Sequence, residues 1–351
     1  MSSLLPQSIL MNLGFFVLSS VGVWFTAWKL TNYLDVISDR TGLNKAFAGI
    51  LFLAVATSLP EIATTGTAGS SGSHQLAISN LLGGIAIQTV VLALVDWIAI
   101  RGKALTSRSP DASLIMQGVI LVLIIAVAIA AFSSKEIYSF MNVGLWSAIL
   151  FITYFIGLYV IYKYSGDPRW QPVEEGPDEA GKEKVQRELQ KKFDKYSTSN
   201  LVLKFLFMAF GVLLFGYLLT KSAEKIVQQT GFSSGVVGST LLAAATSLPE
   251  ITTTWTAVRL GANSMAVGNI LGSNSLMIAL FFFADIFYRK ASIITEAKQN
   301  SIFLGALGII LTGIYIWGIL ERRDKTIFGM GVDSFLIILI YLGGMVLYSR
   351  M

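Results

Sequence analysis

Two nearly identical octapeptides each place a proline and a glutamate inside an apolar segment long enough to cross a lipid bilayer. They are Ala-Val-Ala-Thr-Ser-Leu-Pro-Glu at residues 54–61 and Ala-Ala-Ala-Thr-Ser-Leu-Pro-Glu at residues 243–250. Proline removes a backbone hydrogen bond and interrupts a helix. A carboxylate at the centre of a bilayer costs about 3 kcal/mol even on lenient insertion scales. Because both unfavourable residues occur at the same positions of the two octapeptides, the pattern indicates a site for cations.

The composition is that of a protein with many membrane-spanning segments. Of its 351 residues, 54% are hydrophobic and only 13% are charged, whereas a soluble domain has about a quarter of its residues charged. The net charge of +5 comes without a basic and aromatic groove pattern, so nucleic acid is not an expected partner. The absence of cysteine excludes disulfides and thiolate metal sites.

Ten apolar stretches are each long enough for a spanning helix of about 20 residues. They lie near residues 7–30, 43–68, 75–100, 112–133, 140–163, 200–228, 232–258, 263–288, 300–320 and 328–349. We expect the first to be a true span and not a cleaved signal peptide, because a charged n-region and a small-residue cleavage site are lacking. The sequence therefore predicts an all-α membrane protein with about ten transmembrane helices.

Residues 165–199 differ sharply from the rest of the chain, with three prolines and several acids followed by a Lys/Arg-rich run. We interpret them as an aqueous linker between two five-helix halves, residues 1–164 and 200–351. A regulatory role for this segment is one alternative, and a plain solvated connector is the simpler expectation. A short amphipathic helix is also plausible, because apolar residues recur every four positions at Val185, Leu189 and Phe193.

The two halves are copies of one another. Residues 51–84 align with residues 240–273 without a gap, giving 18 identities in 34 positions. Five spans per half is an odd number, so the second copy must enter the membrane from the opposite side. We therefore expect a pair of inverted repeats, an arrangement used by many secondary transporters.

Lysine and arginine predict the orientation in the cell membrane. Of the 26 such residues, we assign 19 to the side that holds the 165–199 linker and seven to the other side. The positive-inside rule then places the linker in the cytoplasm and both termini outside.

Pro60 and Pro249 are the only prolines inside predicted spans. Each should interrupt its helix and free backbone carbonyls at about residues 54–57 and 243–246. Unwound backbone at this depth survives only where it lines a cavity or finds new partners. Further hard oxygen ligands, which suit Ca²⁺, Na⁺ or Mg²⁺ better than zinc or copper, are Thr57, Ser58, Glu61, Thr246, Ser247 and Glu250. A proline kink with hydroxyls bonded back to the helix is the simpler alternative, but the duplication with a glutamate each time favours the ion site.

Other polar residues in the spans carry weaker signals. Asn80 and Asn269 follow the two motifs, and a hydrogen bond between helices explains them as well as ion contact does. Asp96 and Asp285 fall near span ends, so we interpret them as interfacial. The single histidine, His74, is a weak signal of proton sensing.

At the two Thr-Ser-Leu-Pro-Glu motifs the chain resembles the cation/calcium exchanger superfamily, specifically its sodium/calcium exchanger branch. Members of that branch carry two inverted alpha-repeats, each with Gly-Thr-Ser-Leu-Pro-Glu followed by Gly-Asn-x-x-Gly-Ser-Asn. The resemblance covers most of both halves. It implies that ions are held by the repeat glutamates, the neighbouring Thr and Ser, a carbonyl three residues before that Thr, and a serine on the next helix. The implied ligands are Ala54, Thr57, Ser58, Glu61, Ala243, Thr246, Ser247, Glu250 and Ser273.

The chain departs from this family pattern on the helices that follow the motifs. Gly84 stands where the second repeat keeps Ser273, so the first repeat lacks a hydroxyl ligand. Four residues further on, where the family usually has Asn or Asp, the chain has Gln88 and Met277. A thioether is a poor ligand for a hard cation, so the match to the family's sodium sites and stoichiometry is incomplete.

The expected function is antiport of Ca²⁺, or a similar divalent cation, against Na⁺ by alternating access around a site at the membrane midplane. We expect no cofactor and no enzymatic activity; the partners are inorganic cations and membrane lipid, and the protein should function as a monomer. A proton-coupled exchanger, in which Glu61 and Glu250 take up protons, is the first alternative, and a cation channel is less favoured. A metalloprotease would need a motif such as His-Glu-x-x-His, which a single histidine excludes.

Overall fold

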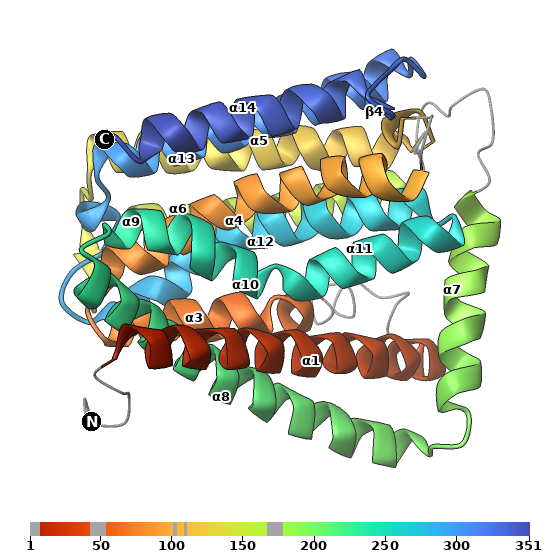
Figure 1. Cartoon of the computed structure of the whole chain (residues 1–351), viewed down its shortest axis with the longest axis horizontal. Helices are drawn as coiled ribbons and strands as arrows, with labels where there is room; N and C mark the ends of the chain where they lie inside the picture. Colours follow the sequence, from red (N-terminus) through yellow and green to blue (C-terminus); the bar gives the residue numbers. More distant parts are fainter. Residues whose placement is uncertain (1–7, 43–53, 101–103, 109–110, 167–177) are drawn as a thin grey trace.

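A computed structural model describes residues 8–42, 54–100, 104–108, 111–166 and 178–351 and has a bundle of long helices (Figure 1). The helices are α1 (Ile9–Thr41), α3 (Leu59–Ser70), α4 (His74–Val95), α5 (Ala112–Ser134), α6 (Leu145–Gly166), α7 (Asp178–Phe193), α8 (Thr198–Thr230), α9 (Ser234–Val237), α10 (Ala243–Thr246), α11 (Leu248–Leu260), α12 (Asn263–Tyr288), α13 (Gln299–Glu321) and α14 (Val332–Tyr348). Single π- or 3₁₀-turns are η2 (Asp96–Ile100), η3 (Thr106–Arg108), η4 (Gly238–Leu242) and η5 (Ile293–Glu296). Two tiny antiparallel hairpins pair β1 (Ser139–Phe140) with β2 (Val143–Gly144) and β3 (Thr326–Ile327) with β4 (Met330–Gly331).

The prediction of an all-α membrane protein is confirmed. Within the described chain, seven helical segments are long and apolar enough to cross a bilayer: Ile9–Thr41, His74–Ile100, Ala112–Ser134, Leu145–Tyr164, Thr198–Thr230, Asn263–Tyr288 and Gln299–Glu321. The remaining expected spans are the two proline-containing segments, which are broken, and α14, which has 17 residues. Part of one predicted span, residues 43–53, lies outside the described residues. The count of ten therefore stays a prediction.

The element order of the first half recurs in the second. The helices α1, α3 and α4 begin at residues 9, 59 and 74, and α8, α11 and α12 begin at residues 198, 248 and 263. The offset between these starts is the one that aligns Glu61 with Glu250. The hairpins and final helices recur at nearly the same offset, since α6 begins at residue 145 and α14 at residue 332. The sequence repeat thus extends to secondary structure in the described parts of both halves, while the inversion of one copy relative to the other stays a prediction.

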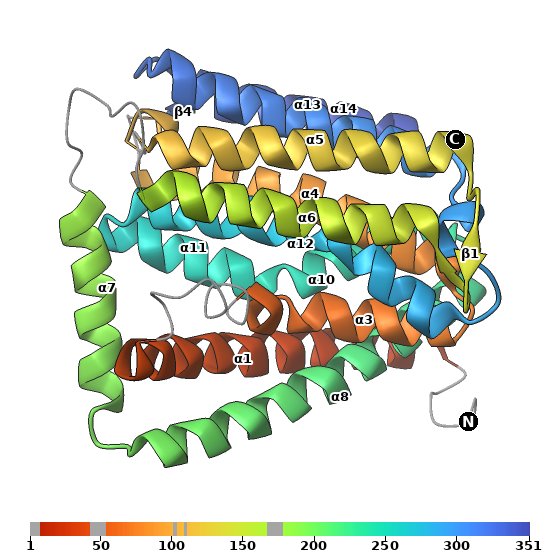
Figure 2. The same ribbon diagram turned by 180° about the vertical axis from the view of Figure 1, so that it is seen from behind.

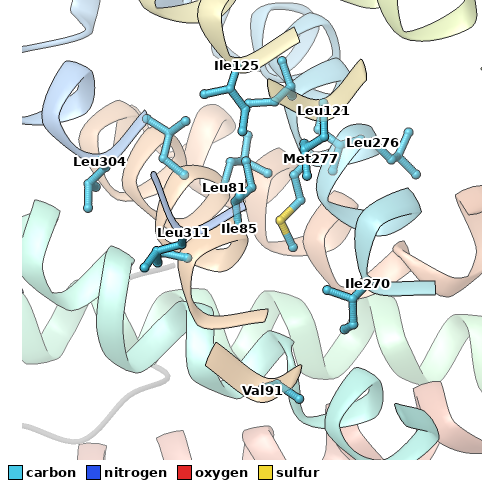
Figure 3. Close-up of a cluster of buried hydrophobic side chains, with 14 of the residues drawn as sticks. Leu81, Ile85, Val91, Leu121, Ile125, Ile270, Leu276, Met277, Leu304 and Leu311 are labelled. Atoms are coloured by element: carbon cyan, nitrogen blue, oxygen red, sulfur yellow. The ribbon is translucent and has the colours of Figure 1, made fainter. Parts of the chain in front are cut away.

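The centre of the bundle is built from both halves. Figures 1 and 2 show α4 and α12 between a pair formed by α1 and α8 and a layer formed by α5, α13 and α14. The helix α3 packs against α12, and α4 packs against η4 and α11, so each half contacts the other here. An apolar cluster that includes Leu81 and Ile85 of α4, Leu121 and Ile125 of α5 and Met277 of α12 fills one side of these helices (Figure 3). In a bilayer this close packing, and not exclusion from water, supplies most of the attraction between helices.

The helix α7 lies across one end of the bundle, and both termini lie at the other end (Figures 1 and 2). Val185 and Phe193 are buried against the bundle and Leu189 is partly buried, so the four-residue spacing marks a docked amphipathic helix. The short amphipathic helix considered for the linker is therefore present, and its apolar face covers part of the bundle. The role of the linker stays a prediction. The division of the chain into two halves, residues 1–164 and 200–351, joined by the linker 165–199 stays a prediction.

Candidate cation site

The site is organised by two helix breaks that match one another. Residues 54–57 are helical, the backbone turns at Ser58 (φ −91°, ψ 19°), and α3 resumes at residue 59. In the second half α10 ends at Thr246, Ser247 turns (φ −84°, ψ 0°), and α11 resumes at residue 248. Both serines lie in the sparsely populated bridge region, which is often used at functional sites. A proline follows two residues later in each case and occupies the first turn of the new helix, where a missing N–H costs nothing.

The freed carbonyls fall within the expected ranges, but they are not those of Ala54 and Ala243. The Ala54 oxygen accepts bonds from Ser58 N at 3.2 Å and Thr57 Oγ1 at 3.0 Å. The Ala243 oxygen accepts the equivalent bonds from Ser247 N at 3.1 Å and Thr246 Oγ1 at 3.2 Å. The helix is thus still intact at both alanines, and proline cannot donate to the carbonyl four residues before it, which is that of Ala56 or Ala245. Ala54, Ala243, Thr57 and Thr246 lie at the breaks as predicted, with their oxygens partly used.

Both repeat glutamates are buried, and three of their four carboxyl oxygens lack a hydrogen-bond partner in the described chain. Glu61 is 1% exposed and Glu250 is 3% exposed. Within the described chain, neither oxygen of the Glu61 carboxyl has a partner, and Oε2 of Glu250 has none. The two carboxyls are close enough for their charges to repel. Two buried carboxylates that repel each other need a cation or protons to be stable.

Other partnerless oxygens lie on the same segments and on the following helices α4 and α12. In the part of the chain that the structure describes, such buried oxygens belong to Ser58, Thr65, Asn80, Ser247, Thr254 and Asn274. A buried polar atom without a partner costs about 1–3 kcal/mol. All of these atoms can accept from a donor or bind a hard cation, so the oxygen set fits Ca²⁺ or Na⁺. Among the described residues, no three or more His, Cys, Asp or Glu side chains are grouped so that they could hold a metal ion by themselves. Hydroxyl and amide oxygens would therefore have to complete the coordination.

Thr65 and Thr254 were not predicted from the sequence. Each lies four residues after a repeat glutamate, one helical turn further along the same face. Both are 1% exposed. They occupy equivalent positions in the two copies, as Glu61 and Glu250 do. They could have been recognised in the sequence because both repeats have a threonine four residues after the glutamate.

The following helices add a polar contact between the halves. Ser273 Oγ donates to Gln88 Oε1 at 2.5 Å, which joins α12 to α4 beside the site. Asn80 donates to Thr64 Oγ1 at 3.2 Å, a bond between α4 and α3. The hydrogen-bonding role considered for Asn80 is therefore confirmed, and its Oδ1 is still without a partner in the described chain. Asn269 lines two cavities near Thr57.

Two cavities reach the first helix break. One of about 390 Å³ runs from α7 to Thr57 and is lined by residues of α1, α7, α11 and α12, including Asp35 and Glu188. The other, of about 230 Å³, touches Ala54, Thr57 and Ser273 from the side of α5 and α6. Two predicted ligands of the first repeat, Ala54 and Thr57, thus adjoin cavities large enough for a small hydrated cation.

Asp96 and Asp285 are structural residues rather than interfacial ones. Both are 0% exposed and accept hydrogen bonds from backbone N–H groups of the loops around them. His74 lies away from the site at the start of α4, with Nε2 3.5 Å from Glu296 Oε2.

A model of the family described as sodium/calcium exchanger protein matches residues 11–164 and 200–349. The chain belongs to that family. It is 27% identical over 270 residues to the uncharacterized membrane protein MJ0091 of Methanocaldococcus jannaschii. The aligned region covers 76% of this chain and 78% of that protein.

Two solved structures show the same exchanger fold. The H⁺/Ca²⁺ exchanger CAX has a TM-score of 0.69 and 16% identity, over 97% of this chain and 85% of that one. The sodium-calcium exchanger NCX_Mj has a TM-score of 0.58 and 19% identity, over 97% of this chain and 99% of that one. The resemblance drawn from the Thr-Ser-Leu-Pro-Glu repeats is therefore confirmed at the level of family and fold.

Proposed function

We propose that this protein is a secondary antiporter that exchanges Ca²⁺, or a similar divalent cation, for Na⁺ across the cell membrane. The observation that carries the proposal is the pair of buried carboxyls of Glu61 and Glu250, one at each helix break, with three of their four oxygens partnerless in the described chain. Membership of a transporter family supports cation/calcium exchange in general. The choice of Na⁺ is the finer part of the proposal.

The two carboxylates supply the charge. Together they balance one divalent cation, and when that cation leaves they must be neutralised by Na⁺ or by protons. Neutral oxygens complete the site: the hydroxyls of Thr57, Ser58, Thr246, Ser247 and Ser273 and the carbonyls at Ala54 and Ala243. Since both ion species use the same oxygens, loading one displaces the other, and this competition is the basis of exchange.

Alternating access follows from the repeat architecture. In the proposed cycle, the two halves are inverted copies, and rocking one pair of helices against the central bundle opens the site to each side in turn. The 390 Å³ cavity between α7 and Thr57 supports an opening toward the side of the linker. With the linker in the cytoplasm, as the Lys/Arg distribution predicts, this side is the inner one. Each chain carries both helix breaks, so a monomer is sufficient.

A proton-coupled exchanger is the second candidate. It is favoured by the same carboxyls, since protons can neutralise Glu61 and Glu250 as well as Na⁺ can. The test is Ca²⁺ flux into proteoliposomes under an imposed Na⁺ gradient and, separately, under an imposed pH gradient.

Flux driven by the Na⁺ gradient alone supports the proposal. Flux driven only by the pH gradient supports the proton-coupled alternative. Flux that runs down the Ca²⁺ gradient without either coupling ion contradicts exchange and indicates a channel.

A further inference from the structure

The helices α4 and α12 contact each other through two pairs of residues that the repeat relates. Positions 84 and 88 on α4 correspond to positions 273 and 277 on α12, in the same alignment that matches the two motifs. In the structure position 88 contacts position 273, and position 277 lies against position 84. A symmetric chain would make the same contact twice. This chain makes two chemically different ones.

The first contact is polar. Ser273 Oγ donates to Gln88 Oε1 at 2.5 Å, and Gln88 is 0% exposed. The donated proton leaves the lone pairs of the serine oxygen available to a cation. The Gln88 Nε2 atom has no partner within the described chain.

The second contact is apolar and fills its space. A Cβ atom on Gly84 would lie 3.0 Å from both Sδ and Cε of Met277, so the thioether occupies the volume where a side chain at position 84 would begin. Met277 is 1% exposed and belongs to the apolar cluster with Ile85 and Leu121 (Figure 3). A thioether is a weak ligand for hard cations, and glycine offers no side-chain oxygen.

We infer that Met277, packed on Gly84, closes one of two repeat-related ligand positions, so that of these four residues only Ser273 and Gln88 can coordinate a cation. This inference rests on the proposed function, since it concerns the same site. It makes Met277 and Gly84 the residues that determine how many monovalent cations the protein holds. The two substitutions support each other, because the glycine makes room for the methionine and the methionine fills what the glycine leaves empty.

The decisive variant copies the polar pair onto the apolar side. The double substitution Gly84→Ser with Met277→Gln gives both sides a serine and a glutamine. The reciprocal variant, Gln88→Met with Ser273→Gly, makes both sides apolar. Gly313→Ser is the matched control for adding a serine to a helix, because a Cβ there meets nothing within 4 Å.

Two measurements are made on each purified protein: the rise in Tm on titration with NaCl alone, and the Na⁺ dependence of Ca²⁺ flux in proteoliposomes. We expect the G84S/M277Q protein to bind Na⁺ roughly five-fold more tightly, as one added neutral ligand allows, and to show a steeper Na⁺ dependence. The reciprocal variant should bind Na⁺ roughly five-fold more weakly. The Gly313→Ser protein should match the wild type.

An unchanged Na⁺ response in either double variant, in a protein that melts cooperatively, overturns the inference. The reciprocal variant keeps the test decisive if the G84S/M277Q protein does not fold. Failure of the proposed function is a separate result, because it is seen in the wild type as Ca²⁺ flux without a coupling ion. The Tm measurement does not depend on transport and so tests the ligand position by itself.

Discussion

The carboxylate of Asp96 accepts a hydrogen bond from the backbone N–H of Gly331 at 2.8 Å, although the two residues are 235 positions apart in the chain. Asp285 makes the matching bond to Gly144 N at 2.7 Å. Each aspartate lies at the end of the central helix of one half and holds the hairpin that precedes the last helix of the other half. The halves are thus fastened to each other at both ends of the bundle by a pair of repeat-related carboxylates.

Alanine at Asp96 or Asp285 should destabilise the protein without weakening its cation site. Each carboxylate also accepts from a second backbone N–H, that of Leu105 or Ile293, and bonds to a charged acceptor contribute about 1.5–3 kcal/mol each. We expect the free energy of unfolding to fall by about 3 kcal/mol or more and Tm to fall with it, while Ca²⁺ affinity of the folded protein is kept. Asp194→Asn, at a side chain that is 86% exposed, is the control for thermal unfolding. Loss of Ca²⁺ binding at unchanged Tm would instead make these aspartates ligands.

Glutamine at Glu61 or Glu250 should abolish divalent cation transport. The substitution keeps the shape and one oxygen but removes half of the negative charge that offsets the cation's dehydration, a loss of several kcal/mol in a site without water. The proteins should fold, because an amide is cheaper to bury than a carboxylate. Ca²⁺ flux in proteoliposomes measures the effect, and Glu183→Gln on the exposed face of α7 is the control. Normal flux in either variant would place the ion elsewhere.

Most of the architecture could be predicted from the sequence because bilayer spans and repeats are periodic and long. Hydropathy located most helices to within a few residues, although α1 continues to Thr41, eleven residues past the expected end at residue 30. The internal repeat located both helix breaks. Two features depend on contacts in the folded protein and could not be predicted from hydropathy or from the repeat. The pairing of Asp96 with Gly331 joins residues that no pattern in the sequence connects. The hydrogen bonds of the Ala54 and Ala243 carbonyls depend on where the helix turns, which proline restricts but does not fix.

Valine at Thr254 should weaken divalent cation binding modestly. The Thr254 hydroxyl is buried, lies one turn after Glu250, and has no partner in the described part of the chain. Valine keeps the volume and removes one neutral oxygen, which contributes roughly 1 kcal/mol or about a five-fold change in Kd. Ca²⁺ binding by isothermal titration calorimetry checks this. Thr256→Val is the control, because that hydroxyl is already bonded to the Thr252 carbonyl at 2.8 Å. An unchanged Kd for Thr254→Val would remove this residue from the ion site.

Introduced cysteines should report the orientation in the membrane, because the natural chain has none. We expect a cysteine at Lys191, exposed on α7, to react with an impermeant thiol reagent only after lysis, since the linker is predicted to be cytoplasmic. A cysteine at Ile137, which is 71% exposed beside the β1 hairpin at the other end of the bundle, should react in intact cells. The reverse pattern would invert the proposed orientation, and labelling of both positions in intact cells would contradict the spans between them.

The helix α7 docks over the cavity that leads to Thr57. A Cβ atom on Gly181 would overlap the backbone of Gly261, so α7 approaches the turn after α11 as closely as a glycine permits. At its other end the ring of Phe193 lies 5.2 Å from that of Tyr33 on α1. The helix therefore ties α1 to the α11–α12 turn across the cavity. Gly181→Leu should lift this end of α7, because a side chain at that position cannot fit.

We expect exchange to continue in the Gly181→Leu protein, because α7 supplies none of the proposed ligands. The maximal rate of Ca²⁺ flux should rise, since entry to the cavity is less obstructed and α1 is freer to move, while the half-saturating Ca²⁺ concentration stays the same. Lys184→Ala, at an exposed position on the same helix, is the control for a change on α7 that leaves its packing intact. Complete loss of flux at normal expression would show the opposite: that a docked α7 is part of the transport cycle, and that the linker cannot be dispensed with.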